Sequence, residues 1–361
     1  MVNLHSLRNR LLLSLLLGVV VFAGLTFYAD YRDVGEALSN FRWELLPLIL
    51  FLTSMNYVFR FVKWEYYLRI IGVKGLARRD SLLIFLSGLG MVITPGKVGE
   101  WLKCYLLREV HGTPIARSAP ILLAERLTDS IALLLMASVG LFVFGDLWWV
   151  FVVVAGGAIA LIAVARHRPT AHALLRFGGR LPVLRRFVPQ LEELYESTYV
   201  LLSPRAVVEM SALSTLSWFF EVLGYYFTLV GVGLAGDLDL LLRAAFILPI
   251  STLASAILLT PGGLGVAEAL LTTLSRELLD ISVSAATVAT FIIRFGTLWF
   301  GVIIGLIAFY ILSRRLSLND ASLSGPDDAG VPPDGEPPQS HGAPPRSGDE
   351  EPVSEPPEAP P

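Results

Sequence analysis

The chain has 361 residues, 54% of them hydrophobic, and a mean hydropathy of +0.64. Its many apolar runs of about 18 or more residues are long enough to cross ~30 Å of hydrocarbon, which excludes a soluble globular protein. The formal net charge of −3 is unevenly distributed, because ten acidic residues and one basic residue, Arg346, follow position 316. The remainder carries a net charge of +6, and its single cysteine, Cys104, excludes an internal disulfide.

Two helices are predicted before the first unusual segment. The apolar run 11–29 follows Arg8 and Arg10 and lacks a small-residue cleavage site, so we expect a retained helix with a cytoplasmic N-terminus. A second helix, 45–62, returns to a positively charged loop that holds Lys63, Arg69, Lys74, Arg78 and Arg79. Within this helix, Arg60 is a further candidate for the charge network, although we expect it to reach water at the cytoplasmic end.

A Pro/Gly break then interrupts an apolar stretch. Residues 81–93 are apolar, and Thr94-Pro95-Gly96-Lys97-Val98-Gly99 follows. We expect a helical hairpin that enters from the cytoplasm and turns back near mid-depth, where protein or a wet cavity must cover the broken backbone. If residues 81–107 instead cross the membrane fully, the orientation of the following helices is reversed.

The rest of the chain continues this topology. The arginine-rich connection 166–205 is expected in the cytoplasm, and a second break at Pro261–Gly265 is expected to dip in from outside. The predicted helices in this part are 119–144, 147–165, 206–232 and 283–311.

The two halves share a motif. Thr94-Pro95-Gly96-Lys97-Val98-Gly99 returns as Thr260-Pro261-Gly262-Gly263-Leu264-Gly265, and Tyr66–Val73 has a counterpart in Tyr225–Val232. The charge bias assigns the two breaks to opposite membrane faces, so repeat one (about 45–144) and repeat two (about 206–311) form an inverted-topology repeat. The fold class is therefore all-α, a polytopic membrane helical bundle with two Pro/Gly-broken re-entrant hairpins.

Each break offers a binding site for an anion. Broken helices leave backbone groups without partners, and a helix N-terminus carries partial positive charge. Lys97 adds a full charge, although the alternative is that it extends to water and the Pro/Gly residues only permit the turn. The candidate substrate-binding residues are Gly96, Lys97, Gly99, Glu100, Gly262, Gly263, Gly265 and Glu268.

A supporting network of charged residues is also predicted. An arginine follows each glutamate at the same distance of 26 residues, Arg126 after Glu100 and Arg294 after Glu268. This spacing suggests a Glu–Arg pair in each half, which either braces the hairpin or contacts the substrate. The network further contains Glu125, Asp129 and Glu221.

These motifs resemble the membrane domain of the lysylphosphatidylglycerol synthase/flippase family. The segments that carry the resemblance are Pro95–Glu100, Glu125–Asp129 and Pro261–Glu268. The resemblance covers residues 1–316 and implies a flippase-like domain that moves an amphiphile between leaflets. Since an acidic, proline-rich segment (317–361) follows in place of a soluble aminoacyl-transfer domain, we expect a disordered cytoplasmic tail and no lysyl transfer.

We therefore expect a translocase for a phospholipid or a lipid-linked anionic substrate in a bacterial inner membrane, with both termini cytoplasmic. The alternatives are a small-molecule or ion transporter, a membrane enzyme, and an accessory subunit of a lipid-synthesis complex with the tail as a docking arm. No GxxxxGK[ST] loop, HExxH or GxSxG motif occurs, so we expect no enzyme activity, cofactor or metal. Expected partners are membrane lipids with anionic headgroups and proteins of lipid biosynthesis, and no nucleic acid.

Overall fold

The computed structural model describes most of the membrane part of the chain. The described residues are 16–94 except 17 and 28, 100–141, 188–258, 261–323 and isolated positions between 152 and 169. The chain divides into two units, Met1–Ser317 and Leu318–Pro361, and the second is described only as far as Leu323. The predicted helix 147–165 and most of the predicted tail therefore lie outside the described residues, and the tail's disorder stays a prediction.

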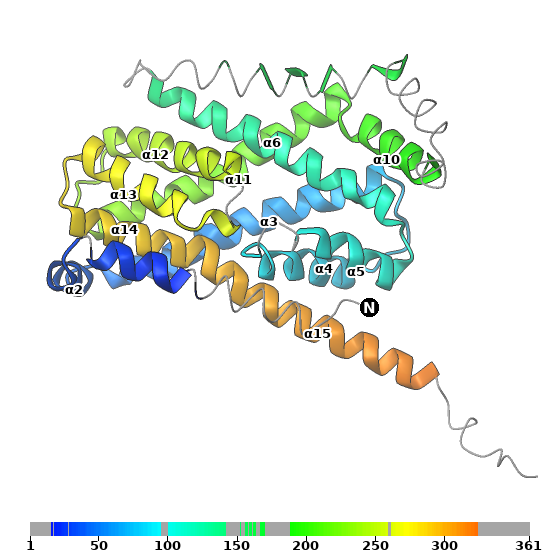
Figure 1. The fold of residues 1–361 in the computed structure, drawn as a ribbon, viewed down its shortest axis with the longest axis horizontal. Helices are drawn as coiled ribbons and strands as arrows, with labels where there is room; N and C mark the ends of the chain where they lie inside the picture. Colours follow the sequence, from blue (N-terminus) through cyan, green and yellow to red (C-terminus); the bar gives the residue numbers. More distant parts are fainter. Residues whose placement is uncertain are drawn as a thin grey trace, which may run out of the picture. The chain divides into compact units, whose positions relative to one another are not determined.

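The regular elements of the described residues are all helical, which confirms the all-α class (Figure 1). In chain order they are Gly18–Phe27, α2 (Tyr31–Ser39), η1 (Trp43–Leu45), α3 (Leu46–Ile70), α4 (Arg78–Gly90), α5 (Leu102–His111), α6 (Ile115–Leu141), α10 (Val188–Leu201), α11 (Pro204–Gly231), α12 (Leu238–Ile257), η4 (Pro261–Gly263), α13 (Val266–Leu279), α14 (Val283–Arg294), the π-helical η5 (Phe295–Trp299) and α15 (Phe300–Leu323).

Helix length separates membrane-crossing helices from shorter ones. Within the described residues, four segments are long and apolar enough to cross a bilayer: Trp43–Ile70, Pro204–Gly231, Leu238–Ala256 and Val283–Leu316. α4, α5 and α13 have 13, 10 and 14 residues. At 1.5 Å per residue they reach only about 15–21 Å, less than the hydrocarbon core. Both helices of the first hairpin are thus short, whereas α12 in the second is long enough to cross.

α3 and α11 pack side by side through polar contacts at their centre. The Asn56 amide donates to the carbonyl of Ser217 at 2.9 Å, and the Ser217 hydroxyl donates to the carbonyl of Asn56 at 3.1 Å. Further along α3, Tyr66 donates to Glu209, which lies earlier in α11, at 2.6 Å. The two helices are therefore antiparallel, the direction that an inverted repeat requires. Their orientation in the membrane stays a prediction.

The ends of α3 and α11 use the same glycine cap. Gly72 and Gly233 have positive φ angles of 80° and 108°. In each cap the next residue donates its N–H to a carbonyl inside the helix, Val73 to Leu68 at 3.0 Å and Leu234 to Leu229 at 3.2 Å. The helix ends thus correspond at Gly72 and Gly233, whereas the sequence match paired Gly72 with a residue two positions earlier. That pairing is wrong, because the matched glycine is still helical.

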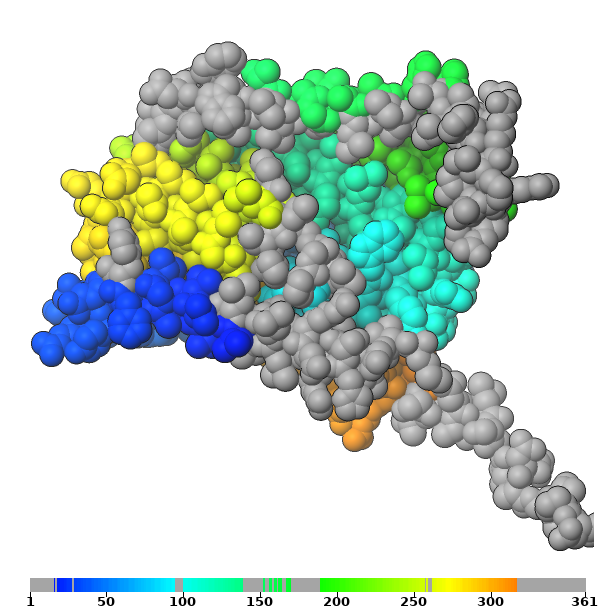
Figure 2. Space-filling view, in the orientation of Figure 1, coloured from blue at the N-terminus to red at the C-terminus, as the bar shows by residue number. Residues whose placement is uncertain are grey.

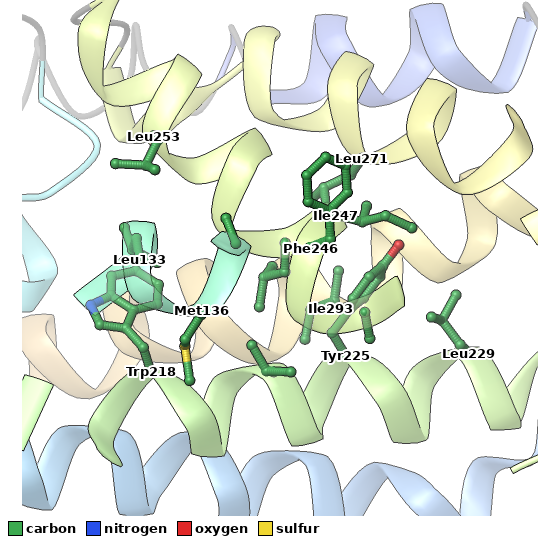
Figure 3. Close-up of a cluster of buried hydrophobic side chains, with 14 of the residues drawn as sticks. Leu133, Met136, Trp218, Tyr225, Leu229, Phe246, Ile247, Leu253, Leu271 and Ile293 are labelled. Carbon is green, nitrogen blue, oxygen red and sulfur yellow. The ribbon is translucent and has the colours of Figure 1, made fainter. Parts of the chain in front are cut away.

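A buried apolar cluster joins α6 to α11, α12, α13 and α14 (Figure 3). Trp218 of α11 lies beside Leu133 and Met136 of α6 (Figure 3), and Phe246 of α12 and Ile293 of α14 belong to the same cluster. Since α6 belongs to the first half of the chain and the other helices to the second, the halves share one core.

The N-terminal segment packs against the second half. α2 packs against α14, and the blue N-terminal residues lie against the yellow second half in Figure 2; Val34 is buried in one cluster with Ile49, Val288 and Ile292. The N-terminal residues thereby cover one side of α14, the helix that ends at a candidate site residue, Arg294.

α4 and α15 cross at two glycines. A Cβ built on Gly90 would lie 2.8 Å from the carbonyl carbon of Gly305, and one built on Gly305 would lie 2.7 Å from the carbonyl oxygen of Leu86. The two backbones are therefore in direct contact, as small residues allow in membrane helix pairs.

Replacing Gly305 by alanine should destabilise the protein by about 1–3 kcal/mol, because the new methyl group collides with backbone that cannot rotate away. The measurement is the thermal unfolding midpoint in detergent. Gly35→Ala in α2 is the control, since a Cβ there meets nothing within 4 Å. Equal unfolding midpoints for the two variants would contradict this contact.

Candidate functional site

The second break, between α12 and α13, depends on glycine. Gly262, Gly263 and Gly265 have positive φ angles of 59°, 74° and 85°. This left-handed conformation costs roughly 1–2 kcal/mol per residue when a Cβ is present. α13 begins at Val266, so the chain turns within a few residues and leaves backbone groups without intrahelical partners.

Glu268 and Arg294 satisfy these backbone groups. One carboxylate oxygen of Glu268 accepts the N–H of Gly265 at 2.7 Å, and the other accepts Nε of Arg294 at 2.6 Å. Nη2 of the same guanidinium donates to the carbonyl of Gly262 at 2.6 Å. One arginine therefore binds both a carboxylate and a carbonyl released by the break, which a lysine, as a point charge, matches poorly.

The first break is described only at its edges. Residues 95–99, including the candidates Gly96, Lys97 and Gly99, lie outside the described residues. Directly after them, Glu100 accepts two bonds from Arg126, from Nε at 3.1 Å and from Nη2. Both Glu–Arg pairs predicted from the 26-residue spacing are therefore confirmed, and each connects a break to the helix that follows its hairpin.

The two pairs differ in burial. Glu268 is fully buried and the Arg294 side chain is 13% exposed, whereas the Glu100 and Arg126 side chains are 11% and 41% exposed. The second pair thus lies inside the protein, and the first reaches an accessible surface through its arginine.

The residues just before the first break contact the second break. Ile93, two residues before the first proline, is buried in one small cluster with Leu264 of the second break and with Leu298 and Val302. A Cβ on Gly262 would lie 3.4 Å from the Cα of Ile93. Segments separated by about half of the chain therefore meet at one point.

A cavity of about 170 Å³ lies where the halves meet. The candidate residues that line it are Glu100, Arg126, Asp129, Glu221, Gly262, Gly263 and Arg294. Glu125, Gly265 and Glu268 do not line it, but Glu268 binds Arg294, which does. Arg60, a further candidate from the sequence, also lines the cavity, as do Tyr57 and Trp218, for which the sequence predicts no role.

Behind the cavity, Lys63 and Asp129 form a buried pair. Nζ of Lys63 lies 2.6 Å from Oδ1 of Asp129 and donates to the Ser214 hydroxyl at 2.6 Å, and that hydroxyl donates to the same Oδ1 at 2.9 Å. The side chains of Lys63 and Asp129 are 3% and 6% exposed. Lys63 was expected in a cytoplasmic loop, and that prediction is wrong because α3 continues to Ile70.

A second buried lysine neutralises Glu125. Nζ of Lys103 lies 2.7 Å from Oε2 of Glu125 and 4.9 Å from the ring centroid of Trp64. Since Glu125 and Asp129 are one turn apart on α6, each is matched by one lysine from a neighbouring helix. The sequence offers one signal for Lys63 and Lys103, because each is a lysine flanked by apolar or aromatic residues.

Arg60 points to the cavity. Its Nη2 lies 3.6 Å from Oδ2 of Asp129, and its guanidinium lies 6.0 Å from the ring centroid of Trp218. The expectation that Arg60 extends to water at the cytoplasmic end is therefore wrong. The described cavity wall thus carries three arginines, Arg60, Arg126 and Arg294, and three carboxylates, Glu100, Asp129 and Glu221.

The comparisons with known proteins agree with this architecture. A family model described as the lysylphosphatidylglycerol synthase TM region matches residues 15–305. The chain belongs to this family. With four candidate membrane-crossing helices among its described residues, it is a multi-pass membrane protein.

Two relatives match parts of the chain. A UPF0104 membrane protein of Methanothermobacter thermautotrophicus is 31% identical over 131 residues, 36% of this chain and 37% of that protein. Glycosyltransferase AglD of Haloferax volcanii is 23% identical over 318 residues, 78% of this chain and 51% of that protein. The matches thus cover about half or less of each relative's own length.

Replacing Arg294 by alanine should destabilise the protein by about 3–5 kcal/mol, because the buried charge of Glu268 then has no cationic partner. Arg126→Ala should have a smaller effect, since its pair is more exposed. The measurement is thermal unfolding in detergent, and adding Glu268→Gln to Arg294→Ala should restore part of the loss. A larger effect of Arg126→Ala would contradict the difference in burial.

Proposed function

We propose that this protein is a flippase-like translocase, which carries the headgroup of a phospholipid or lipid-linked anionic substrate through the cavity between the breaks. The observation that carries the proposal is that broken segments from both halves of the chain converge on one charged cavity. In membrane transporters, substrate sites lie at such repeat interfaces, where discontinuous helices meet.

The size of the cavity favours a headgroup over a whole lipid. Pockets that enclose drug-sized ligands measure about 300–1,000 Å³. The cavity here, at about 170 Å³, is smaller. A headgroup could enter while its acyl chains stay in the surrounding hydrocarbon, which requires no large apolar pocket.

The charges of the cavity support recognition of an anion through exchange of partners. Arg126 and Arg294 are bonded to Glu100 and Glu268, so a phosphate must compete with these carboxylates. Guanidinium groups bind carboxylate and phosphate with the same two-pronged geometry, so the arginine keeps its hydrogen bonds when a phosphate replaces a carboxylate. We further propose that Lys97, which the sequence places in the first break, contributes to binding the anion.

The relatives' names point in the same direction at a coarser level. The family takes its name from a lipid synthase and one relative from a glycosyltransferase, both linked to lipid or glycolipid metabolism. The name glycosyltransferase describes that relative, of which this chain matches about half, and for this chain we propose membrane translocation. We place it in a bacterial inner membrane with both termini cytoplasmic, with membrane lipids and proteins of lipid biosynthesis as partners.

Leaflet exchange in proteoliposomes tests the function. With a fluorescent phospholipid, dithionite should quench well beyond half of the label when the wild-type protein is present. Ala256→Phe, which fills the cavity without removing a charge, should abolish this excess, and Lys97→Ala should reduce it.

The matched control is Ala212→Phe on α11, because Ala212 is exposed and outside the cavity wall. It should leave exchange unchanged. Quenching that stops near half for the wild type, with anionic and zwitterionic lipids alike, would contradict the proposal.

Labelling of introduced cysteines tests the inverted orientation. Lys97→Cys marks the first break, and Leu258→Cys marks the start of the second, where the residue is 62% exposed. The native Cys104 is buried and is replaced by alanine in the same chain. A membrane-impermeant maleimide should reach the two positions from opposite sides, with permeabilised membranes as the control. Labelling of both from one side would exclude the inverted repeat.

A further inference from the structure

Glu221 is a cavity-lining carboxylate whose charge no neighbour neutralises directly. It lies on α11 and lines the cavity wall. Within the described residues, it forms no ion pair or hydrogen bond. By contrast, Glu100 is bonded to Arg126 and Asp129 to Lys63, so the other two carboxylates of the described wall have cationic partners.

The charged groups around Glu221 come from three packed helices. Arg60 of α3, Asp129 of α6 and Arg294 of α14 act on it electrostatically, and Tyr57 of α3 also faces it. Arg294 is bonded to Glu268 and to a backbone carbonyl, so it is not available to Glu221. The Tyr57 hydroxyl already donates to the carbonyl of Thr297 at 2.9 Å.

Of the two arginines near Glu221, Arg60 has the longer contact with its carboxylate partner. Its 3.6 Å approach to Asp129 is longer than a hydrogen bond, and the same carboxylate is bonded more closely by Lys63 at 2.6 Å. Arg60 can therefore approach a charged Glu221 without leaving Asp129 unpaired. When Glu221 is neutral, that attraction disappears.

An ionised carboxylate at membrane depth is costly unless it is paired, and uptake of a proton removes the charge. Intramembrane carboxyl groups that face a cavity commonly serve as proton relays in pumps and transporters. We propose that Glu221 is a proton-binding site of the cavity, which takes up a proton from water on one side of the membrane and releases it on the other. The proton forms an O–H bond with the carboxylate and leaves as it came, so no other reactant is needed.

The coupling of proton binding to transport rests on the proposed function. If the protein moves lipid headgroups, protonation of Glu221 couples that movement to a proton gradient by changing the charge that Arg60 meets. Proton binding itself does not depend on which substrate the cavity takes.

Infrared spectroscopy of the full-length protein in liposomes tests proton binding directly. The C=O stretch of a protonated carboxyl group should appear as the pH falls, shift in D₂O, and be lost in Glu221→Gln. Glu221→Asp, which keeps a carboxyl group, should retain a titrating band and shows that the site tolerates substitution. Glu277→Gln is the control, because that side chain is 61% exposed and outside the cavity wall. A wild-type spectrum identical to that of Glu221→Gln at every pH would overturn the proposal, as would a band that responds to Na⁺ and not to pH.

Lipid exchange under an imposed pH gradient tests coupling. Wild type and Glu277→Gln should show an exchange rate that depends on the direction of the gradient, and Glu221→Gln should lose that dependence whatever its basal rate. Gradient-dependent exchange that persists in Glu221→Gln would overturn the coupling. If no lipid exchange occurs but the infrared band titrates, the translocase proposal fails and proton binding at Glu221 stands.

Discussion

The structure depends on one requirement. The backbone N–H and C=O groups that a broken helix leaves without partners inside a membrane protein must form other hydrogen bonds. Without water, each unpaired N–H or C=O group in hydrocarbon costs several kcal/mol. At the second break this requirement is met by one guanidinium and one carboxylate, since Arg294 binds both Glu268 and the carbonyl of Gly262. The arginine must therefore lie at one position along the following helix, which explains the fixed spacing between glutamate and arginine.

The same requirement shapes the helix that carries Arg294. α14 ends at this residue, and the π-helical segment Phe295–Trp299 follows at once. Such segments are rare and often occur at functional sites. Here Thr297, Leu298 and Gly301 continue the cavity wall beyond Arg294, so the irregular helix borders the place where both breaks meet.

Both halves of the chain have a Glu–Arg pair next to a break, but the two pairs differ in burial and in the ion pairs around them. In the second half the arginine neutralises a fully buried glutamate and a backbone carbonyl. In the first half, the arginine is more exposed, and two lysines, Lys63 and Lys103, neutralise the additional carboxylates of α6. Buried ion pairs contribute little net stability but become costly when one partner is lost. They therefore fix which helices are neighbours, and they leave Glu221 as the carboxylate of the described wall that has no ion pair.

The sequence by itself determined the features that depend on local order along the chain. Apolar runs defined the helical membrane class, Pro and Gly residues placed the two breaks, and the 26-residue spacing identified both Glu–Arg pairs, because a hairpin and its next helix are joined by a short connection. The charge pattern predicts that the second helix ends before Lys63, whereas α3 continues to Ile70.

The tertiary structure alone decided the contacts between distant segments. The approach of Ile93 to Gly262, the pairing of Lys63 with Asp129 and the contact of Arg60 with Asp129 all join segments that are far apart in the chain. Sequence spacing does not encode these contacts, because each depends on the rotation and register of helices that are far apart in the chain and are fixed only when their side chains pack together.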